Sequence, residues 1–239
     1  MASSTWTDAL CLVDTVMPRQ LHDHWFKEAK REGWRSRAYY KLKALDEKRR
    51  LIRAGDAVLD CGCAPGSWLQ YADVQVGDRG IVVGIDLQEF SPLPSRQIRT
   101  LVGDLRLIED ERILALAEPR RLNAFDVVLS DMAPNTTGHR DTDHLRSLDL
   151  CNLVLDRCNT LLREGGHLVM KVFEGSGYPG LVERTKSTFE VVRPMRPPAS
   201  RSVSREMYLV GMNKKTGMAT GETEPGGEGP PPVPDAWSN

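Results

Sequence analysis

The sequence lacks any run of apolar residues long enough to cross a membrane. No hydrophobic stretch approaches the ~18 residues that a spanning helix needs, so we expect no membrane partner. Cysteine is scarce: the chain has 5 in 239 residues, at irregular spacing. This pattern favours a reduced, cytoplasmic setting over a disulfide framework. The sequence also shows no Cys/His cluster with the spacing of a metal site, so no metal is expected.

We also expect no targeting sequence in the first residues, and the chain has no large excess of one sign of charge. Residues 1–8 carry an acid and no arginine, and they resemble neither a secretory nor a mitochondrial presequence. The net charge is −1, but it hides an uneven distribution. Between Arg19 and Arg53 there are 12 Lys/Arg against 5 Asp/Glu, and a second basic cluster contains Arg193, Arg196, Arg201 and Arg205. Two basic segments that flank a neutral core are typical of a protein that binds a polyanion such as a nucleic acid. Alternatively, the two segments are simply the solvent-exposed faces of helices.

The most informative segment is Val58–Trp68, which reads Val-Leu-Asp-Cys-Gly-Cys-Ala-Pro-Gly-Ser-Trp. It predicts a buried strand, a glycine turn and then a helix. Gly62 and Gly66 permit the positive φ values and close backbone approach of a ligand-binding turn. We interpret Cys61 and Cys63 as small residues that fill the corner, with metal or redox chemistry as the less favoured alternative.

A second strand, Ile81–Asp86, also ends in an acid. Its distance from the turn is typical of a nucleotide-binding βαβ unit whose acid binds a ribose. The glycines do not match the G-x-G-x-x-G pattern of dinucleotide sites. We therefore expect a Rossmann-like site for another adenosine ligand, with S-adenosylmethionine as the leading candidate because it carries no pyrophosphate.

Strand and helix patterns alternate through the middle of the chain, which predicts an α/β fold: a mostly parallel sheet with helices on both faces. We expect three parts: a basic helical segment (1–55) packed on the catalytic domain, the domain itself (56–212) and a disordered tail (213–239) rich in Gly, Pro, Thr and Glu. Ser36 is the expected N-cap of a helix in the first part. The predicted strands are Ala57–Cys61, Gly80–Asp86, Ile98–Val102, Phe125–Ser130, His167–Val172, Phe189–Val192 and Met207–Gly211; the predicted helices are Trp68–Val76, Glu109–Ala117, Asp143–Leu162 and Pro179–Thr188.

Four charged residues invite a chemical explanation. Asp131 ends a strand and precedes Pro134-Asn135, which forces a loop over the sheet edge where ligands bind. Lys171 lies inside an apolar strand, where a lysine is costly to bury unless it is paired. Lys41 borders the apolar face of a helix and could simply extend to solvent, and Glu206 opens the last strand.

These motifs together resemble the FtsJ/RrmJ (RlmE) family of RNA ribose 2′-O-methyltransferases. The motifs are Ser-Arg-Ala-Tyr-Tyr-Lys-Leu, Asp-Cys-Gly-Cys-Ala-Pro-Gly-Ser-Trp, Ser-Asp-Met-Ala-Pro-Asn, Val-Met-Lys-Val-Phe-Glu-Gly and Ser-Arg-Glu-Met-Tyr, spread from about Leu21 to Met212. The resemblance implies a seven-stranded, Rossmann-like methyltransferase fold and a catalytic tetrad of Lys41, Asp131, Lys171 and Glu206. It also implies donor contacts at Gly66, Trp68, Asp86, Asp104 and Asp131, beside the turn residue Gly62.

The implied reaction is methylation of a uridine ribose in large-subunit ribosomal RNA by a monomer. Lys171 could act as a neutral base or as a cation that stabilises the developing alkoxide. Instead of binding the donor, Asp104 could form an Asx turn with the backbone that follows it. We interpret His139 and His144 as loop and helix-start residues rather than metal ligands. Three other functions stay open: methylation of mitochondrial rRNA, methylation of tRNA, and RNA binding without catalysis. Methylation of a small molecule is a fourth alternative, which the two basic segments disfavour.

Overall fold

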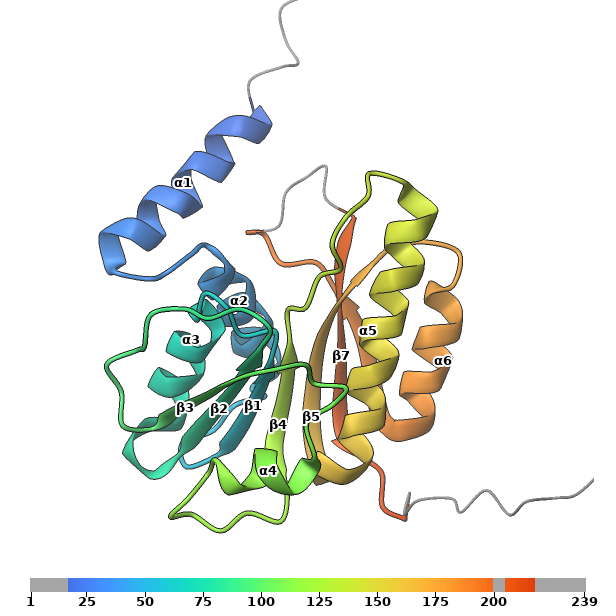
Figure 1. The fold of residues 1–239 in the computed structure, drawn as a ribbon. Helices are drawn as coiled ribbons and strands as arrows, with labels where there is room; N and C mark the ends of the chain where they lie inside the picture. The colour runs from blue at the N-terminus through green and yellow to red at the C-terminus, as the bar shows by residue number, and fades with distance from the viewer. Residues whose placement is uncertain (1–16, 200–204, 218–239) are drawn as a thin grey trace, which may run out of the picture.

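The computed structural model describes residues 17–199 and 205–217. Its centre is a seven-stranded sheet with the order β3-β2-β1-β4-β5-β7-β6 (Figure 1). The strands are β1 (Ala57–Cys61), β2 (Ile81–Asp86), β3 (Ile98–Val102), β4 (Phe125–Ser130), β5 (Leu162–Phe173), β6 (Phe189–Met195) and β7 (Glu206–Lys214). Neighbours from β3 to β5 pair in parallel, while β7 is antiparallel to both β5 and β6. The predicted seven-stranded, mostly parallel sheet is confirmed.

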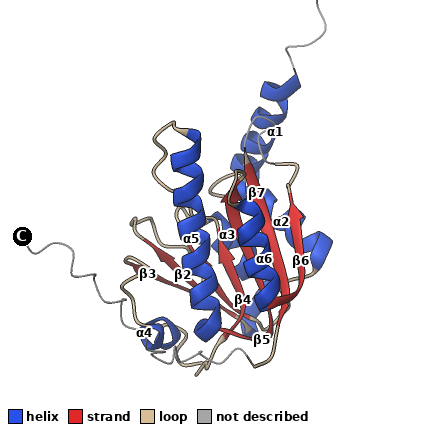
Figure 2. Cartoon of the chain, turned by 90° about the vertical axis from the view of Figure 1, so that its right-hand side faces the viewer, coloured by secondary structure: helices blue, strands red, loops and turns tan. Residues whose placement is uncertain are grey.

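Helices cover both faces of the sheet (Figure 2). They are α1 (Met17–Glu32), α2 (Ala38–Arg49), α3 (Ser67–Val76), α4 (Asp110–Ala115), α5 (Arg140–Leu161) and α6 (Tyr178–Thr188), with a 3₁₀ turn, η1 (Gly77–Arg79), after α3. Every residue of β1 is buried, and its alternating side chains enter two separate cores. Val58 packs with α2 and α3, and Leu59 packs with α5. Among the described helices, none is both long and apolar enough to span a membrane.

Two details of the sequence prediction need correction. The cap of α2 is Arg37 rather than Ser36, although the Ser36 hydroxyl still accepts the amide of Ala38 at 3.1 Å. The last strand also continues past residue 212, since β7 ends at Lys214. The side chain of Lys214 is buried there, and its Nζ donates to three carbonyl oxygens where α5 passes into β5, including that of Cys158 at 2.6 Å. The predicted tail beyond residue 217 lies outside the described part of the chain.

Candidate active site

The turn after β1 requires glycine at its first position. Gly62 has φ +79°, and a Cβ placed there would lie 2.5 Å from Cγ of Met132 and 3.0 Å from its backbone Cα. Three backbone amides hold the turn against β2: Gly62 and Cys63 donate to the carbonyl of Ile85 at 2.8 and 3.2 Å, and Ala64 donates to Oδ2 of Asp86 at 2.8 Å. The chain therefore passes close to the loop after β4, and no side chain fits between them.

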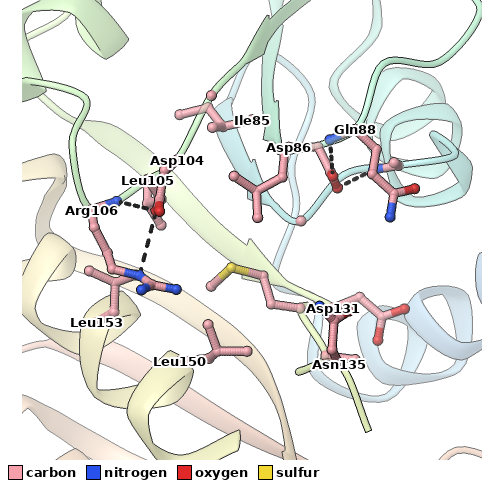
Figure 3. Close-up of a pocket in the computed structure, with 16 residues that line it drawn as sticks. Ile85, Asp86, Gln88, Asp104, Leu105, Arg106, Asp131, Asn135, Leu150 and Leu153 are labelled. Atoms are coloured by element: carbon pink, nitrogen blue, oxygen red, sulfur yellow. Dashed lines mark hydrogen bonds and ion pairs between the residues drawn. The ribbon is translucent and has the colours of Figure 1, made fainter. Parts of the chain in front are cut away.

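A cavity of about 290 Å³ lies beside this turn, at the carboxyl ends of β1, β2 and β4 (Figure 3). Gly62, Asp86, Asp104 and Asp131 line it, as do apolar side chains such as Ile85 and Leu153. Asp86 accepts the amide of Gln88 at 2.9 Å, and Asp104 accepts the amide of Arg106 at 2.9 Å. The Asp104 contact is the Asx turn that the sequence suggested as an alternative, and the same carboxylate also lines the cavity.

Gly66 and Trp68, also predicted to bind the donor, are not among the residues that line this cavity. Gly66 has φ +106°, and a Cβ there would lie 3.1 Å from the Arg35 guanidinium. The Trp68 ring is buried, donates from Nε1 to the carbonyl of Ala38 at 2.9 Å, and lies 5.8 Å from the ring of Tyr208. Their predicted donor contacts stay predictions.

The cavity suits S-adenosylmethionine. Glycine at position 62 lets the turn pack directly against Met132, so that both line the same cavity. Three carboxylates around it can accept ribose hydroxyls and an adenine amino group, and they favour a ligand with positive charge. Apolar walls can pack against the adenine ring.

The four predicted catalytic residues form two ion pairs at the end of the sheet next to the cavity. Lys171 Nζ lies 3.0 Å from Oδ1 of Asp131 and donates to the backbone carbonyl of Asp131 at 2.5 Å. Lys41 Nζ donates to Oε2 of Glu206 at 2.7 Å. Antiparallel pairing of β5 with β7 places Lys171 opposite Tyr208 and Phe173 opposite Glu206, so the two pairs are neighbours. Both lysines are buried, and the solvent-extended alternative for Lys41 is wrong.

The charges in this cluster influence one another. Burial raises the pKa of Glu206, but the cations of Lys41, Lys171 and Arg37 outweigh burial and keep that pKa below its ordinary value. Glu206 therefore stays ionised as the partner of Lys41. Burial and the carboxylates of Asp131 and Glu206 hold the pKa of Tyr208 far above its usual range.

Two site residues were missed by the sequence argument. Tyr208 donates its hydroxyl to Oδ1 of Asp131 at 2.9 Å, on the carboxylate that Lys171 contacts. Its signal was available, because it follows Glu206 by two residues and so faces the same side of the strand. Arg35 joins the two loops beside the donor turn by donating to the carbonyls of Pro65 (2.5 Å) and Pro92 (2.9 Å). No local pattern predicts those contacts.

Other conspicuous residues have structural roles. Cys61 and Cys63 are buried, and burial raises the pKa of both thiols, as expected for corner-filling residues. His144 is buried near the start of α5; its Nδ1 lies 2.8 Å from the carbonyl of Phe173, and its Nε2 accepts the amide of Gly177. Within residues 17–199 and 205–217, no group of three or more His, Cys, Asp or Glu side chains could hold a metal ion.

The sheet order, the glycine turn after β1 and the acids that line the cavity define the class of protein. It is an α/β methyltransferase that uses S-adenosylmethionine. Within that class the chain belongs to the FtsJ-like methyltransferase family, whose model matches residues 34–214. The fold agrees with this assignment: the chain is similar to a fibrillarin from Aeropyrum pernix with bound S-adenosyl-L-methionine, at a TM-score of 0.51 and 18% identity over 73% of each chain.

Several relatives are much more similar. The ribosomal RNA large subunit methyltransferase E of Methanobrevibacter smithii is 42% identical over 81% of this chain and 91% of the relative. The protein of the same name from Bdellovibrio bacteriovorus is 39% identical over 84% of this chain and 100% of the relative. A solved ribosomal RNA methyltransferase from Plasmodium falciparum matches with a TM-score of 0.67 and 30% identity, over 76% of this chain and 98% of that one.

The glycine turn can be tested by Gly62→Ala, with Gly33→Ala as the matched control. Both glycines have nearly the same φ, +79° and +80°, but a Cβ at Gly33 meets no atom within 4 Å. The positive φ costs both variants about 1–2 kcal/mol of folding stability. Gly62→Ala should in addition lose donor affinity, because the turn must move away from Met132. Calorimetry with S-adenosylmethionine and thermal unfolding measure the two effects; equal donor affinity in both variants would contradict the proposed role of the turn.

Proposed function

We propose that this protein methylates the 2′-hydroxyl of a uridine ribose in large-subunit (23S-type) ribosomal RNA. The proposal includes action as a monomer in the cytoplasm, on RNA within the large ribosomal subunit. The observation that carries it is the Lys171–Asp131 pair, which lies beside the donor cavity with Lys41–Glu206 as its neighbour. The names of the relatives support a ribosomal RNA target.

The residues can divide the chemical work. The donor, when bound, supplies an electrophilic methyl group on a sulfonium. Asp131 orients Lys171 through its carboxylate and its carbonyl, and Tyr208 holds the same carboxylate in place. Lys171 donates in both contacts, as an ammonium does; in the complex it could stabilise the developing alkoxide or, after losing a proton, accept that of the hydroxyl. Alignment of hydroxyl and methyl group can supply ~7–11 kcal/mol of the barrier reduction.

Three alternatives to this proposal were named from the sequence: methylation of mitochondrial ribosomal RNA, methylation of tRNA, and RNA binding without catalysis. A mitochondrial ribosomal RNA or a tRNA would use the same site with another docking surface. A non-catalytic RNA-binding protein would not need two buried lysines paired with carboxylates, since buried charges are costly to retain. The paired lysines therefore favour an enzyme over a scaffold.

Mapping of ribose methylation tests the target directly. Total RNA from a strain that lacks the gene should lose one 2′-O-methyluridine in the large-subunit ribosomal RNA, and the wild-type gene should restore it. Incubation of purified protein with large subunits and with free RNA from that strain would show which substrate is used. Loss of a tRNA mark, with ribosomal RNA unchanged, would replace the proposal with the tRNA alternative.

The RNA surface should be tested away from Arg35 and Arg37. Both residues belong to the basic segment between Arg19 and Arg53, so charge reversal there would be an obvious test of RNA docking. However, Arg35 holds the loops beside the donor turn, and Arg37 acts on Glu206. Lys30 and Arg193 are exposed members of the two basic clusters and are better choices, whereas Arg201 lies outside the described residues.

We expect Lys30→Glu and Arg193→Glu each to raise the KM for RNA several-fold, with the donor Kd unchanged. The salt dependence of RNA affinity should also become shallower, because each variant neutralises fewer phosphates. Lys186→Glu is the matched control, since Lys186 is an exposed lysine on α6 outside both clusters. Salt-independent RNA binding by the wild-type protein would contradict an electrostatic docking surface.

A further inference from the structure

Asp60, the fourth residue of β1, is a fully buried carboxylate with an unusual environment. Its exposed fraction is 0%, and neither oxygen has a hydrogen-bond partner among the residues that the structure describes. Buried carboxylates usually accept hydrogen bonds, and Asp46 is an example in this protein. It accepts from the amides of Leu51 and Ile52 and from the hydroxyl of Tyr71. An ionised carboxylate without partners is costly to bury, so Asp60 requires an explanation.

The neighbours of Asp60 add negative charge rather than compensate it. Its strand, β1, lies between β2 and β4. Asp86 ends β2 and Asp131 directly follows β4, and both line the cavity. The charges of both carboxylates act on Asp60. In the turn, Cys63 contributes only a buried thiol. Lys171 on β5 is paired with Asp131. Burial first, and then the charges of Asp131 and Asp86, raise the pKa of Asp60 well above its ordinary value.

We propose that Asp60 is a positioning residue that distinguishes the methyl donor from the spent product by charge. Without a ligand, Asp60 keeps its proton. When the sulfonium-bearing donor binds, the O–H bond of Asp60 ionises, the proton passes to solvent, and the carboxylate becomes a counter-charge beneath the turn. After methyl transfer the sulfur is an uncharged thioether, so Asp60 takes a proton back from solvent and the product is held less tightly.

This mechanism gives donor affinity a defined pH dependence. Because donor binding releases a proton, the affinity for the donor rises with pH below the raised pKa of Asp60. The affinity for the uncharged product depends less on pH, because product binding releases fewer protons. The preference for donor over product therefore increases with pH. The inference rests on the use of S-adenosylmethionine and is independent of the RNA target, so its failure would leave the proposed function unchanged.

Calorimetry in two buffers of different ionisation enthalpy tests the proposal through the number of protons released. The wild-type protein at neutral pH should release more protons with S-adenosylmethionine than with S-adenosylhomocysteine. Asp60→Asn keeps the shape of the side chain but cannot ionise, so this difference should disappear. Its donor Kd should rise about tenfold relative to its product Kd, the equivalent of one pKa unit.

Asp56→Asn is the matched control. Asp56 directly precedes β1, at the end of the strand away from the turn, and burial raises its pKa as well. This variant should keep the wild-type proton release and donor preference. Equal proton release with donor and product in the wild-type protein would overturn the proposal, and this measurement needs no variant to fold. Retention of the full donor preference by a folded Asp60→Asn protein would overturn it too.

Discussion

Lys171→Ala should abolish methyl transfer almost completely while donor and RNA binding persist. The Lys171 ammonium is buried, contacts two oxygens of Asp131 and lies beside the donor cavity, where the acceptor hydroxyl must meet the methyl group. Loss of base or alkoxide-stabilising help alone should cost about 10²–10⁴-fold in rate. Single-turnover methylation of large ribosomal subunits, together with calorimetry for the donor, separates the chemical step from binding.

Two further lysine variants sharpen this test. Lys171→Arg should also fail, because a guanidinium stays protonated and does not fit the contacts of an ammonium. Lys214→Met removes another buried lysine, on β7, whose Nζ donates to three backbone carbonyls where α5 passes into β5. The Lys214 variant should lose stability but keep its rate per folded molecule. Near wild-type turnover by Lys171→Ala would require the tetrad assignment to be abandoned.

Asp131→Ala should lose activity and donor affinity together. Its carboxylate holds both Lys171 and the Tyr208 hydroxyl, and the same residue lines the donor cavity. Removal leaves the Lys171 ammonium buried without its counter-charge, which is strongly destabilising for such a pair. We expect a rate loss close to that of Lys171→Ala and a higher donor Kd, measured by the same two assays.

Glu206→Ala and Tyr208→Phe provide the comparison. Glu206 pairs with Lys41, whereas Asp131 pairs with Lys171, so loss of Glu206 should reduce the rate less and leave the donor Kd unchanged. Tyr208→Phe removes one hydrogen bond to Asp131 and should cost less than Asp131→Ala. If Asp131→Ala affected only the rate, the cavity described here would not be the donor site.

The positions of strands and acids could be predicted because their signals are local. Val58 and Leu59 form a buried run that ends in Asp60 and a glycine turn, and the observed β1 has the predicted bounds. Parallel strands place their carboxyl ends at one edge of the sheet, so acids at those ends could be expected to converge. Even there, the predicted end of the last strand was too early, because β7 continues to Lys214, a second buried lysine.

The sequence by itself determined the α/β class, the glycine turn and the family, and it singled out the four residues of the predicted catalytic tetrad. Only the tertiary structure decided how they pair, since Lys41 and Glu206 are 165 residues apart and meet through the packing of α2 near β7. It also showed that Arg35 holds the donor loops and that Asp60 has no partner among the described residues. These contacts depend on which residues, far apart in the sequence, are brought together in the low-dielectric interior. The spacing of residues along the chain does not predict them.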